Sequence, residues 1–221
     1  MTPNTDGDQH TSAEERGFTH RFDPSPSGRR RTLVLLHGTG GTEDDLIPLG
    51  KQLSPGAALL SVRGRILENG MPRFFRRSAE GVFDQQDLEL QTHALARFVR
   101  LAAKKYGLDD AGLVAVGYSN GASIASSLVL RYPRLLAAAV LFRPMVPFIP
   151  LTMPNLQRMK IFIGAGKHDQ IVQGRETEQI AEIFQGAGAV VTIHWHNGGH
   201  ELGEDDLLAA TNWISEWLGR D

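Results

Sequence analysis

The chain has 221 residues, of which 41% are hydrophobic and 22% charged, and its formal net charge is −2. This length and apolar content suffice for one hydrophobic core, and the nearly balanced charge argues against a nucleic-acid-binding protein, which usually carries a strong basic excess. The chain contains no cysteine, which excludes disulfides, thiolate chemistry and cysteine-ligated zinc sites.

The N-terminal residues 1–20 are polar and lack the apolar run of a secretory signal. We expect them to form a disordered or loosely attached arm, followed by one domain over residues 21–221. No stretch reaches the roughly 18 apolar residues of a membrane span. The sequence therefore predicts a cytoplasmic protein that does not bind membranes.

Short apolar runs alternate with helical patterns along the rest of the chain. The runs expected to form strands are 33–36, 57–62, 113–116, 138–142, 160–163 and 190–195. The expected helices cover 44–53, 86–106, 120–132, 176–185 and 204–218. Nearly continuous apolar strands that alternate with helices are typical of a parallel sheet covered on both faces. We predict an α/β fold with a doubly wound, mostly parallel sheet flanked by helices.

A G-x-S-x-G motif supplies the candidate nucleophile. Gly117-Tyr118-Ser119-Asn120-Gly121 lies between a predicted strand and a predicted helix. This is the setting of the nucleophile elbow in the α/β-hydrolase fold, where a strained turn exposes the serine at the start of a helix. An ordinary turn with a chance match is the competing interpretation, and the strand-turn-helix context argues against it.

A serine hydroxyl needs a base to remove its proton. The order in this fold is nucleophile, acid, histidine, and the histidine follows the last strand. Among the eight histidines only His200, in Asn197-Gly198-Gly199-His200, fits that position well. The acid must lie between the serine and the histidine at the end of a strand, which favours Asp169. Glu176, Glu178 and Glu182 fall on a helix face and are expected to be solvated.

A glycine-rich segment, His37-Gly38-Thr39-Gly40-Gly41, follows the first strong strand. Such a segment can present a backbone N–H toward the serine, so we predict the amides of Thr39 and Asn120 as the oxyanion hole. His37 is expected to support the loop rather than act as a base. Phosphate binding is disfavoured because the glycine spacings of nucleotide-binding loops are absent.

Several motifs together resemble the bacterial phospholipase/carboxylesterase branch of the α/β-hydrolases. They are Leu-Leu-His-Gly-Thr-Gly-Gly at 35–41, Ser-Val-Arg-Gly at 61–64, Gly-Tyr-Ser-Asn-Gly-Ala at 117–122, Gly-Lys-His-Asp at 166–169 and Asn-Gly-Gly-His at 197–200. Glu-Asn-Gly-Met-Pro-Arg-Phe-Phe-Arg-Arg at 68–77 is similar to the small carboxylesterases associated with hydroquinone response. The resemblance covers about residues 33–217.

This resemblance implies hydrolysis of carboxylic esters or thioesters without a cofactor, through an acyl-enzyme on Ser119. The related acyl-protein thioesterases carry Phe-Ser-Gln-Gly at the elbow, whereas this chain has Tyr-Ser-Asn-Gly at 118–121. That departure argues against long-chain acyl-protein substrates. The alternatives are a thioesterase, a lysophospholipase-type acyl hydrolase or short peptidase, and a non-catalytic small-molecule receptor on the same fold.

Two segments are expected to shape the substrate site. Fewer than twenty residues separate the strands ending at 142 and beginning at 160, too few for a large lid, so we predict an open site for small esters. Its apolar walls are expected to include Met71, Phe74, Phe75, Met145, Val146 and Phe148, although these residues could instead pack the loops.

The long irregular segment 63–84 also contains Arg63, Arg65, Arg73, Arg76 and Arg77. Arginine forks suit carboxylate recognition, so one or two of them could favour anionic substrates, with Arg73 as the first candidate. Ion pairing with acidic residues of the same segment is an equally good interpretation.

Neither a metal nor a cofactor is expected. His194 and His196 lie on one face of a strand without an obvious third ligand, so they are interpreted as exposed strand histidines. The expected partner is a small-molecule ester, with no nucleic acid and no membrane. A homodimer is one candidate for the assembly.

Overall fold

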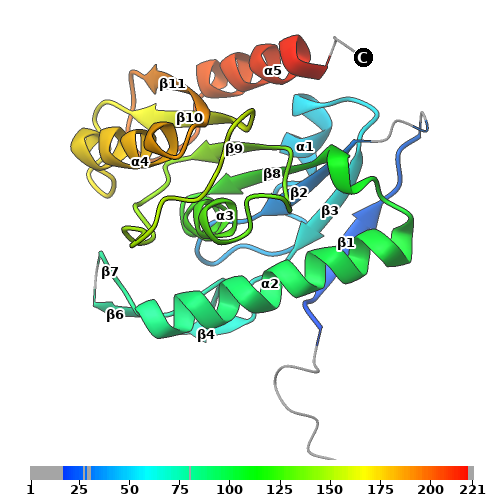
Figure 1. The fold of residues 1–221 in the computed structure, drawn as a ribbon, viewed down its shortest axis with the longest axis horizontal. Helices are drawn as coiled ribbons and strands as arrows, with labels where there is room; N and C mark the ends of the chain where they lie inside the picture. The colour runs from blue at the N-terminus through cyan, green and yellow to red at the C-terminus, as the bar shows by residue number, and fades with distance from the viewer. Residues whose placement is uncertain (1–16, 27, 29–30, 80, 219–221) are drawn as a thin grey trace, which may run out of the picture.

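A seven-stranded sheet forms the centre of the computed structural model, which describes residues 17–26, 28, 31–79 and 81–218 (Figure 1). The strand order is β1-β3-β2-β8-β9-β10-β11. The strands are β1 (His20–Asp23), β2 (Thr32–Leu36), β3 (Ala58–Val62), β8 (Leu113–Tyr118), β9 (Ala138–Phe142), β10 (Lys160–Gly166) and β11 (Val190–His196). All neighbouring pairs are parallel except β1 with β3. The predicted doubly wound, mostly parallel sheet is therefore confirmed.

Helices cover both faces of this sheet, as Figure 1 shows. One core packs α2 (Gln85–Tyr106), α3 (Asn120–Arg131) and α4 (Gly174–Gly186) against one face. A second core packs α1 (Ile47–Leu53) and α5 (Glu204–Leu218) against the other. Strands β2, β3, β8 and β9 are buried at every position except Tyr118, because they have a helix layer on each side.

Local signals set the ends of the longest helix. The Asp84 carboxylate accepts a hydrogen bond from the Asp87 amide at the start of α2, which satisfies one of the free N–H groups of the first turn. Gly107, with φ of 63°, ends the helix in the left-handed conformation that glycine adopts without strain. None of the helices within the described ranges combines the length and apolar character that a membrane crossing requires.

The predicted loose arm over residues 1–20 does not extend over residues 17–20. Residues 1–16 lie outside the described residues, but Phe18 is buried against Phe98 and His20 begins β1. β1 was missed in the sequence because His20–Asp23 carries three polar residues and pairs only at the sheet edge. The expectation of a loose arm as far as residue 20 is therefore wrong for residues 17–20.

The segment 63–84 is more regular than predicted. It contains two small hairpins, β4 (Ile66–Glu68) with β5 (Met71–Arg73) and β6 (Arg77–Ala79) with β7 (Val82–Phe83). Their strands are two or three residues long, too short to give a recognisable alternation in the sequence. β10 also extends beyond its predicted end at residue 163, because Gly164–Gly166 continue the strand although glycines usually indicate a loop.

Candidate active site

Ser119 lies in a strained turn at the end of β8, directly before α3. Its φ of 54° and ψ of −114° are unusual for a residue with a side chain, and such strain occurs mainly where the surrounding structure enforces it. A Cβ at Gly121 would lie 2.0 Å from the Leu36 carbonyl oxygen, and one at Gly117 would lie 2.6 Å from the Gly121 oxygen. The two glycines of the motif are therefore needed for the close packing that holds Ser119 in this conformation.

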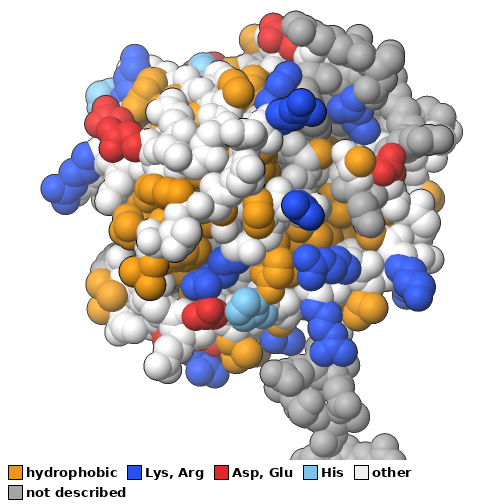
Figure 2. All heavy atoms as spheres, in the orientation of Figure 1, with side chains coloured by type: hydrophobic (Ala, Val, Ile, Leu, Met, Phe, Trp, Pro, Cys, Tyr) orange, Lys and Arg blue, Asp and Glu red, His pale blue; other side chains and the backbone are white. Residues whose placement is uncertain are grey.

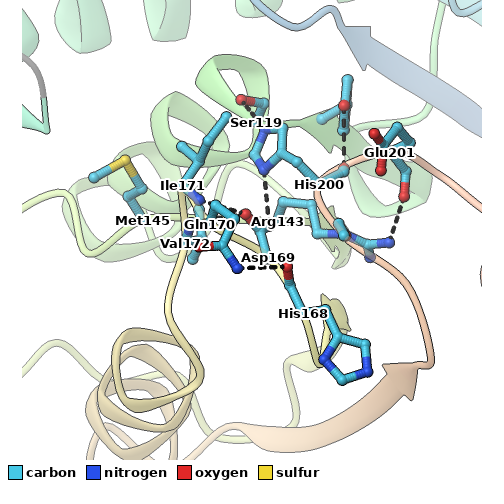
Figure 3. A network of polar contacts seen from close by, with 12 residues as sticks. Ser119, Arg143, Met145, His168, Asp169, Gln170, Ile171, Val172, His200 and Glu201 are labelled. Carbon is cyan, nitrogen blue, oxygen red and sulfur yellow. Dashed lines mark hydrogen bonds and ion pairs between the residues drawn. The ribbon is translucent and has the colours of Figure 1, made fainter.

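A chain of hydrogen bonds runs from Ser119 through His200 to Asp169, three residues from three different loops (Figure 3). The Ser119 Oγ lies 2.9 Å from Nε2 of His200, and Nδ1 of the same ring lies 2.8 Å from Oδ2 of Asp169. The geometry suits removal of the serine proton by an imidazole whose orientation the carboxylate fixes. The structure thus brings together the three residues that the sequence selected.

The side chain of Asp169 is held in place by burial and by hydrogen bonds. Its side chain is fully buried, and its second oxygen, Oδ1, accepts hydrogen bonds from the amides of Ile171 (2.7 Å) and Val172 (2.9 Å). These two hydrogen bonds fix the orientation of the carboxylate. The free oxygen Oδ2 is thereby directed at His200.

The glycine-rich loop lies next to Tyr118 and Ser119, and one backbone and one side-chain hydrogen bond join it to the hairpin β4–β5. Thr39 is exposed and Asn120 is the first residue of α3. Neither amide N–H donates a hydrogen bond to any residue within the described ranges, so both are available to an oxyanion. The Gly40 amide donates to the Pro72 oxygen (2.9 Å), and the Arg73 guanidinium donates to Thr39 Oγ1 (3.0 Å).

His37 supports this loop, as the sequence predicted. Its Nδ1 lies 2.6 Å from the Gly38 carbonyl, and its Nε2 accepts from the Gly64 amide at 2.9 Å. This pattern requires the neutral ring with the proton on Nδ1. Burial lowers the pKa of His37, which favours the same neutral form.

The predicted apolar walls divide into two groups. Met71 is exposed, and its side chain lies beside Gly40 of the glycine-rich loop. Met145 and Val146 are partly exposed. Phe74 and Phe75 are completely buried in the core, so the prediction that they line the site is wrong. The Phe74 amide instead donates to Oδ1 of Asn120 at 2.7 Å, and this hydrogen bond joins segment 63–84 to the start of α3.

Other apolar residues near the site were missed. Ile171, two residues after Asp169, is 60% exposed, and Figure 3 shows it with Met145 on the side of Ser119 and His200 that faces away from Glu201. Apolar side chains also gather on the left of Figure 2. Ile149, Leu151 and Met153, in the segment that follows β9, are exposed, but Met153 lies by Gly186 at the far end of α4. Isolated apolar residues in polar loops give no periodic signal, so the sequence did not single them out.

Glu176 is also placed differently from the prediction. It is partly buried at the start of α4, and its Oε1 accepts from the Val146 amide at 3.2 Å. Burial raises its pKa above the usual range of a glutamate. The expectation of a solvated helix charge is therefore wrong for this residue.

The arginines of segment 63–84 are mostly engaged in ion pairs. Arg73 and Arg77 both contact Glu68, at 3.3 and 3.0 Å, and Arg63 contacts Glu43. These contacts support the ion-pairing interpretation of the arginines over the recognition of anionic substrates.

One group of side chains away from Ser119 has the composition of a metal site. Ligand atoms of His196, Asp205 and Asp206 lie within 4.8 Å of one another, and His194 is 3.7 Å from Asp205. His194 and His196 were predicted to be exposed strand histidines, but both are partly buried and lie beside Asp205. Both oxygens of Asp206 already accept hydrogen bonds from Arg143, so this carboxylate is paired with a cation of the protein itself.

A family comparison agrees with this geometry. The model of the dienelactone hydrolase family matches residues 75–205, more than half of the chain. The chain belongs to the dienelactone hydrolase family. MhqD of Bacillus subtilis (strain 168), which is named as a hydrolase, is 45% identical over 184 residues, covering 83% of this chain and 92% of that protein. The predicted resemblance to the hydroquinone-response type is therefore confirmed.

Solved structures of similar proteins have the same fold. The carboxylesterase of Bacillus cereus is 45% identical, with a TM-score of 0.87 over 90% of this chain and 94% of that chain. The carboxylesterase of Mesorhizobium loti is 32% identical, with a TM-score of 0.85 over 90% and 94%. Dienelactone hydrolases are α/β-hydrolases, and the central sheet with its two helix layers has that arrangement without a large additional domain.

Proposed function

We propose that the protein is a serine carboxylesterase that hydrolyses small carboxylic esters. The observation that carries the proposal is the hydrogen-bonded chain from Ser119 through His200 to the buried Asp169, which begins at a strained serine beside two free amides. Two solved relatives described as carboxylesterases support the substrate class.

The proposed reaction has two halves, acylation of Ser119 and hydrolysis of the acylated serine, and both halves use the same groups. Ser119 Oγ attacks the ester carbonyl while His200 Nε2 takes the serine proton, and the amides of Thr39 and Asn120 stabilise the oxyanion. His200 then gives its proton to the departing alcohol, which leaves an acyl group on Ser119. A water molecule, activated by the same imidazole, releases the acid and restores the serine. Asp169 keeps the His200 ring in the required tautomer throughout.

The surroundings of Ser119 support small esters. The segment from 143 to 159 contains no helix, so this segment does not form a helical lid over the serine. The partly or fully exposed Met71, Met145 and Ile171 provide short apolar surfaces for the acyl or alcohol group. A thioesterase would use the same groups, and the free amides favour an enzyme over a non-catalytic receptor.

Turnover of p-nitrophenyl acetate, butyrate and octanoate tests this proposal. We expect the highest kcat/KM with acetate or butyrate, because the apolar surfaces near the serine are short. Ser119→Ala and His200→Ala should each lower kcat by about 10⁶-fold, the magnitude seen when a serine hydrolase loses its nucleophile or its base. Turnover that persists in Ser119→Ala, or its absence from the native protein with every ester and the matching thioesters, would contradict the proposal.

A further inference from the structure

Arg143 is a completely buried arginine whose role the proposed reaction does not explain. It directly follows β9, its side chain has no exposed surface, and its φ of 56° is unusual for a residue with a side chain. Its amide donates to the Gly164 oxygen at 2.8 Å. Burying a cation is costly unless it is paired and hydrogen-bonded, so this position calls for a physical explanation.

The guanidinium of Arg143 is fully paired. Nη1 and Nη2 donate to Oδ1 and Oδ2 of Asp206 at 2.9 and 2.6 Å, and the Asp206 side chain is also completely buried. This bidentate arrangement is the strongest geometry for an arginine and a carboxylate. Asp206 lies in the first turn of α5, so the pair joins the end of β9 to that helix.

The remaining N–H groups of Arg143 bind the backbone beside His200. Nε donates to the Gly199 oxygen at 3.2 Å and Nη2 to the Glu201 oxygen at 2.7 Å, and Figure 3 shows the side chain pointing toward Glu201. The hydroxyl of Tyr118 donates to the carbonyl between them, that of His200, at 3.2 Å. Three consecutive carbonyl groups, at 199, 200 and 201, are therefore held by side chains from the residues that follow β9 and precede Ser119.

We propose that Arg143, through its paired Asp206, is a positioning residue that holds the backbone on both sides of His200 so that the imidazole stays between Ser119 and Asp169. The inference rests on the proposed esterase function. The loop at 197–201 contains Gly198 and Gly199, which leave its backbone with many accessible conformations. Direct bonds from a buried, rigid guanidinium remove that freedom next to the base.

The buried pair fits a positioning role better than a stabilising role. Replacing a buried ion pair with apolar residues of similar volume is often neutral or stabilising, so the pairing of two buried charges does not by itself imply a gain in stability. A substitution of both partners can therefore separate the two roles, because it removes the donors to the loop without leaving an unpaired buried charge.

The test is the paired variant Arg143→Met/Asp206→Leu. We expect this variant to be more stable than Arg143→Met alone, because no buried charge is left unpaired. Its kcat for p-nitrophenyl acetate should be lower by roughly 10- to 100-fold and its KM within about twofold of the native value, because displacement of a catalytic group affects the chemical step. Arg131→Met is the matched control, since Arg131 pairs with Glu89 on α2, away from His200. It should leave kcat unchanged.

A folded paired variant with native kcat would overturn the proposal. If the paired variant fails to fold, Arg143→Lys keeps a cation beside Asp206 but lacks the fork that reaches both carbonyls. The same fall in kcat is expected for it, and native kcat in this variant would likewise overturn the proposal.

A measurement independent of turnover separates this inference from the proposed function. The proton between His200 Nδ1 and Asp169 should give a downfield resonance in the proton NMR spectrum of the native protein. It should broaden or disappear in the paired variant, whether or not the protein hydrolyses esters. A resonance as sharp as that of the native protein would contradict the positioning role. Loss of this resonance without any ester turnover in the native protein would support the positioning role and contradict only the esterase.

Discussion

Two buried arginines hold the two loops that flank Ser119, and they do so differently. Ser119 follows β8, whose neighbours in the sheet are β2 and β9. Arg143 follows β9 and binds the loop of His200, whereas Arg73 binds Thr39 in the loop that follows β2. Both therefore act on groups that the proposed reaction uses, one on the base and the other on an oxyanion donor.

The difference between them lies in the carboxylate partner. Asp206 is fully buried and both of its oxygens bind Arg143, whereas Glu68 is 23% exposed and is shared by Arg73 and Arg77. Burial lowers the pKa of Arg73, and the nearby Glu68 offsets part of that effect. Arg143 and Asp206 thus form an isolated, buried ion pair beside the His200 loop. Beside the Thr39 loop, Arg73 belongs to a partly exposed network in which Arg77 and water can still bind Glu68 when Arg73 is removed.

Removing each arginine alone should show this difference most strongly. Arg143→Met leaves Asp206 buried and unpaired, which should lower the free energy of unfolding by about 3–5 kcal/mol. Arg73→Met leaves Glu68 with Arg77 and with access to water, so a loss of about 1–2 kcal/mol is expected. Urea denaturation of the two variants measures both values. Equal losses would show that the two sides do not differ in this way.

Gly166→Ala tests how closely the His200 loop fits against the sheet. A Cβ at Gly166 would lie 2.0 Å from the Gly199 oxygen, so the loop that carries His200 must move. We expect kcat to fall by about 100-fold, the cost of a displacement near 1 Å at a catalytic group. Gly174→Ala is the control, because its Cβ would contact only the Trp195 ring at 3.4 Å. Equal rates in the two variants would contradict the close fit.

Arg73→Gln tests the role of the other arginine. Because Arg73 is bonded to Glu68 and Thr39, its loss should disturb the oxyanion loop and lower kcat/KM by about 10-fold on neutral and acidic esters alike. Arg76→Gln is the comparison variant, since Arg76 is exposed, and should change neither rate. A loss confined to acidic esters in Arg73→Gln would instead support recognition of an anionic substrate.

Glu176 gives a smaller, pH-dependent effect. Its pKa is raised by burial, so the folded protein holds its proton more tightly than the unfolded chain. The stabilising contribution of this group is fully present below its unfolded pKa of about 4.5 and is lost as the pH rises through the folded pKa.

Glu176→Gln resembles the protonated form and tests this expectation. Its melting temperature should rise relative to that of the native protein between about pH 4 and pH 7, because the native carboxylate loses its proton over this range and the amide does not. A constant difference between the two proteins across this range would contradict it.

The sequence predicted the central part of the fold because burial on both sides makes strand residues uniformly apolar. The runs that became β2, β3, β8 and β9 had this property, and the glycine pattern around Ser119 fixed the turn. The edge strand β1 and the two hairpins were missed, since half-exposed strands of two to four residues have no distinctive pattern.

Site residues were predictable from the sequence where a motif and the chain order leave few candidates. They were less predictable where three-dimensional packing decides which side chains face the site. Ser119, Asp169 and His200 followed from motif and order, and the structure brings them together. Phe74 and Phe75 were assigned to the walls because of their composition, but packing places them in the core. Arg143 was not singled out, because its partner Asp206 is 63 residues away and its other acceptors are backbone oxygens.

The most direct test of the account is covalent labelling with a fluorophosphonate probe, followed by mass spectrometry of the intact protein and of its peptides. The proposal predicts one adduct per chain, on Ser119, formed rapidly in the native protein, far more slowly in His200→Ala and not at all in Ser119→Ala. An unlabelled native protein, or an adduct on any other residue, would contradict the claim that Ser119 is an activated nucleophile.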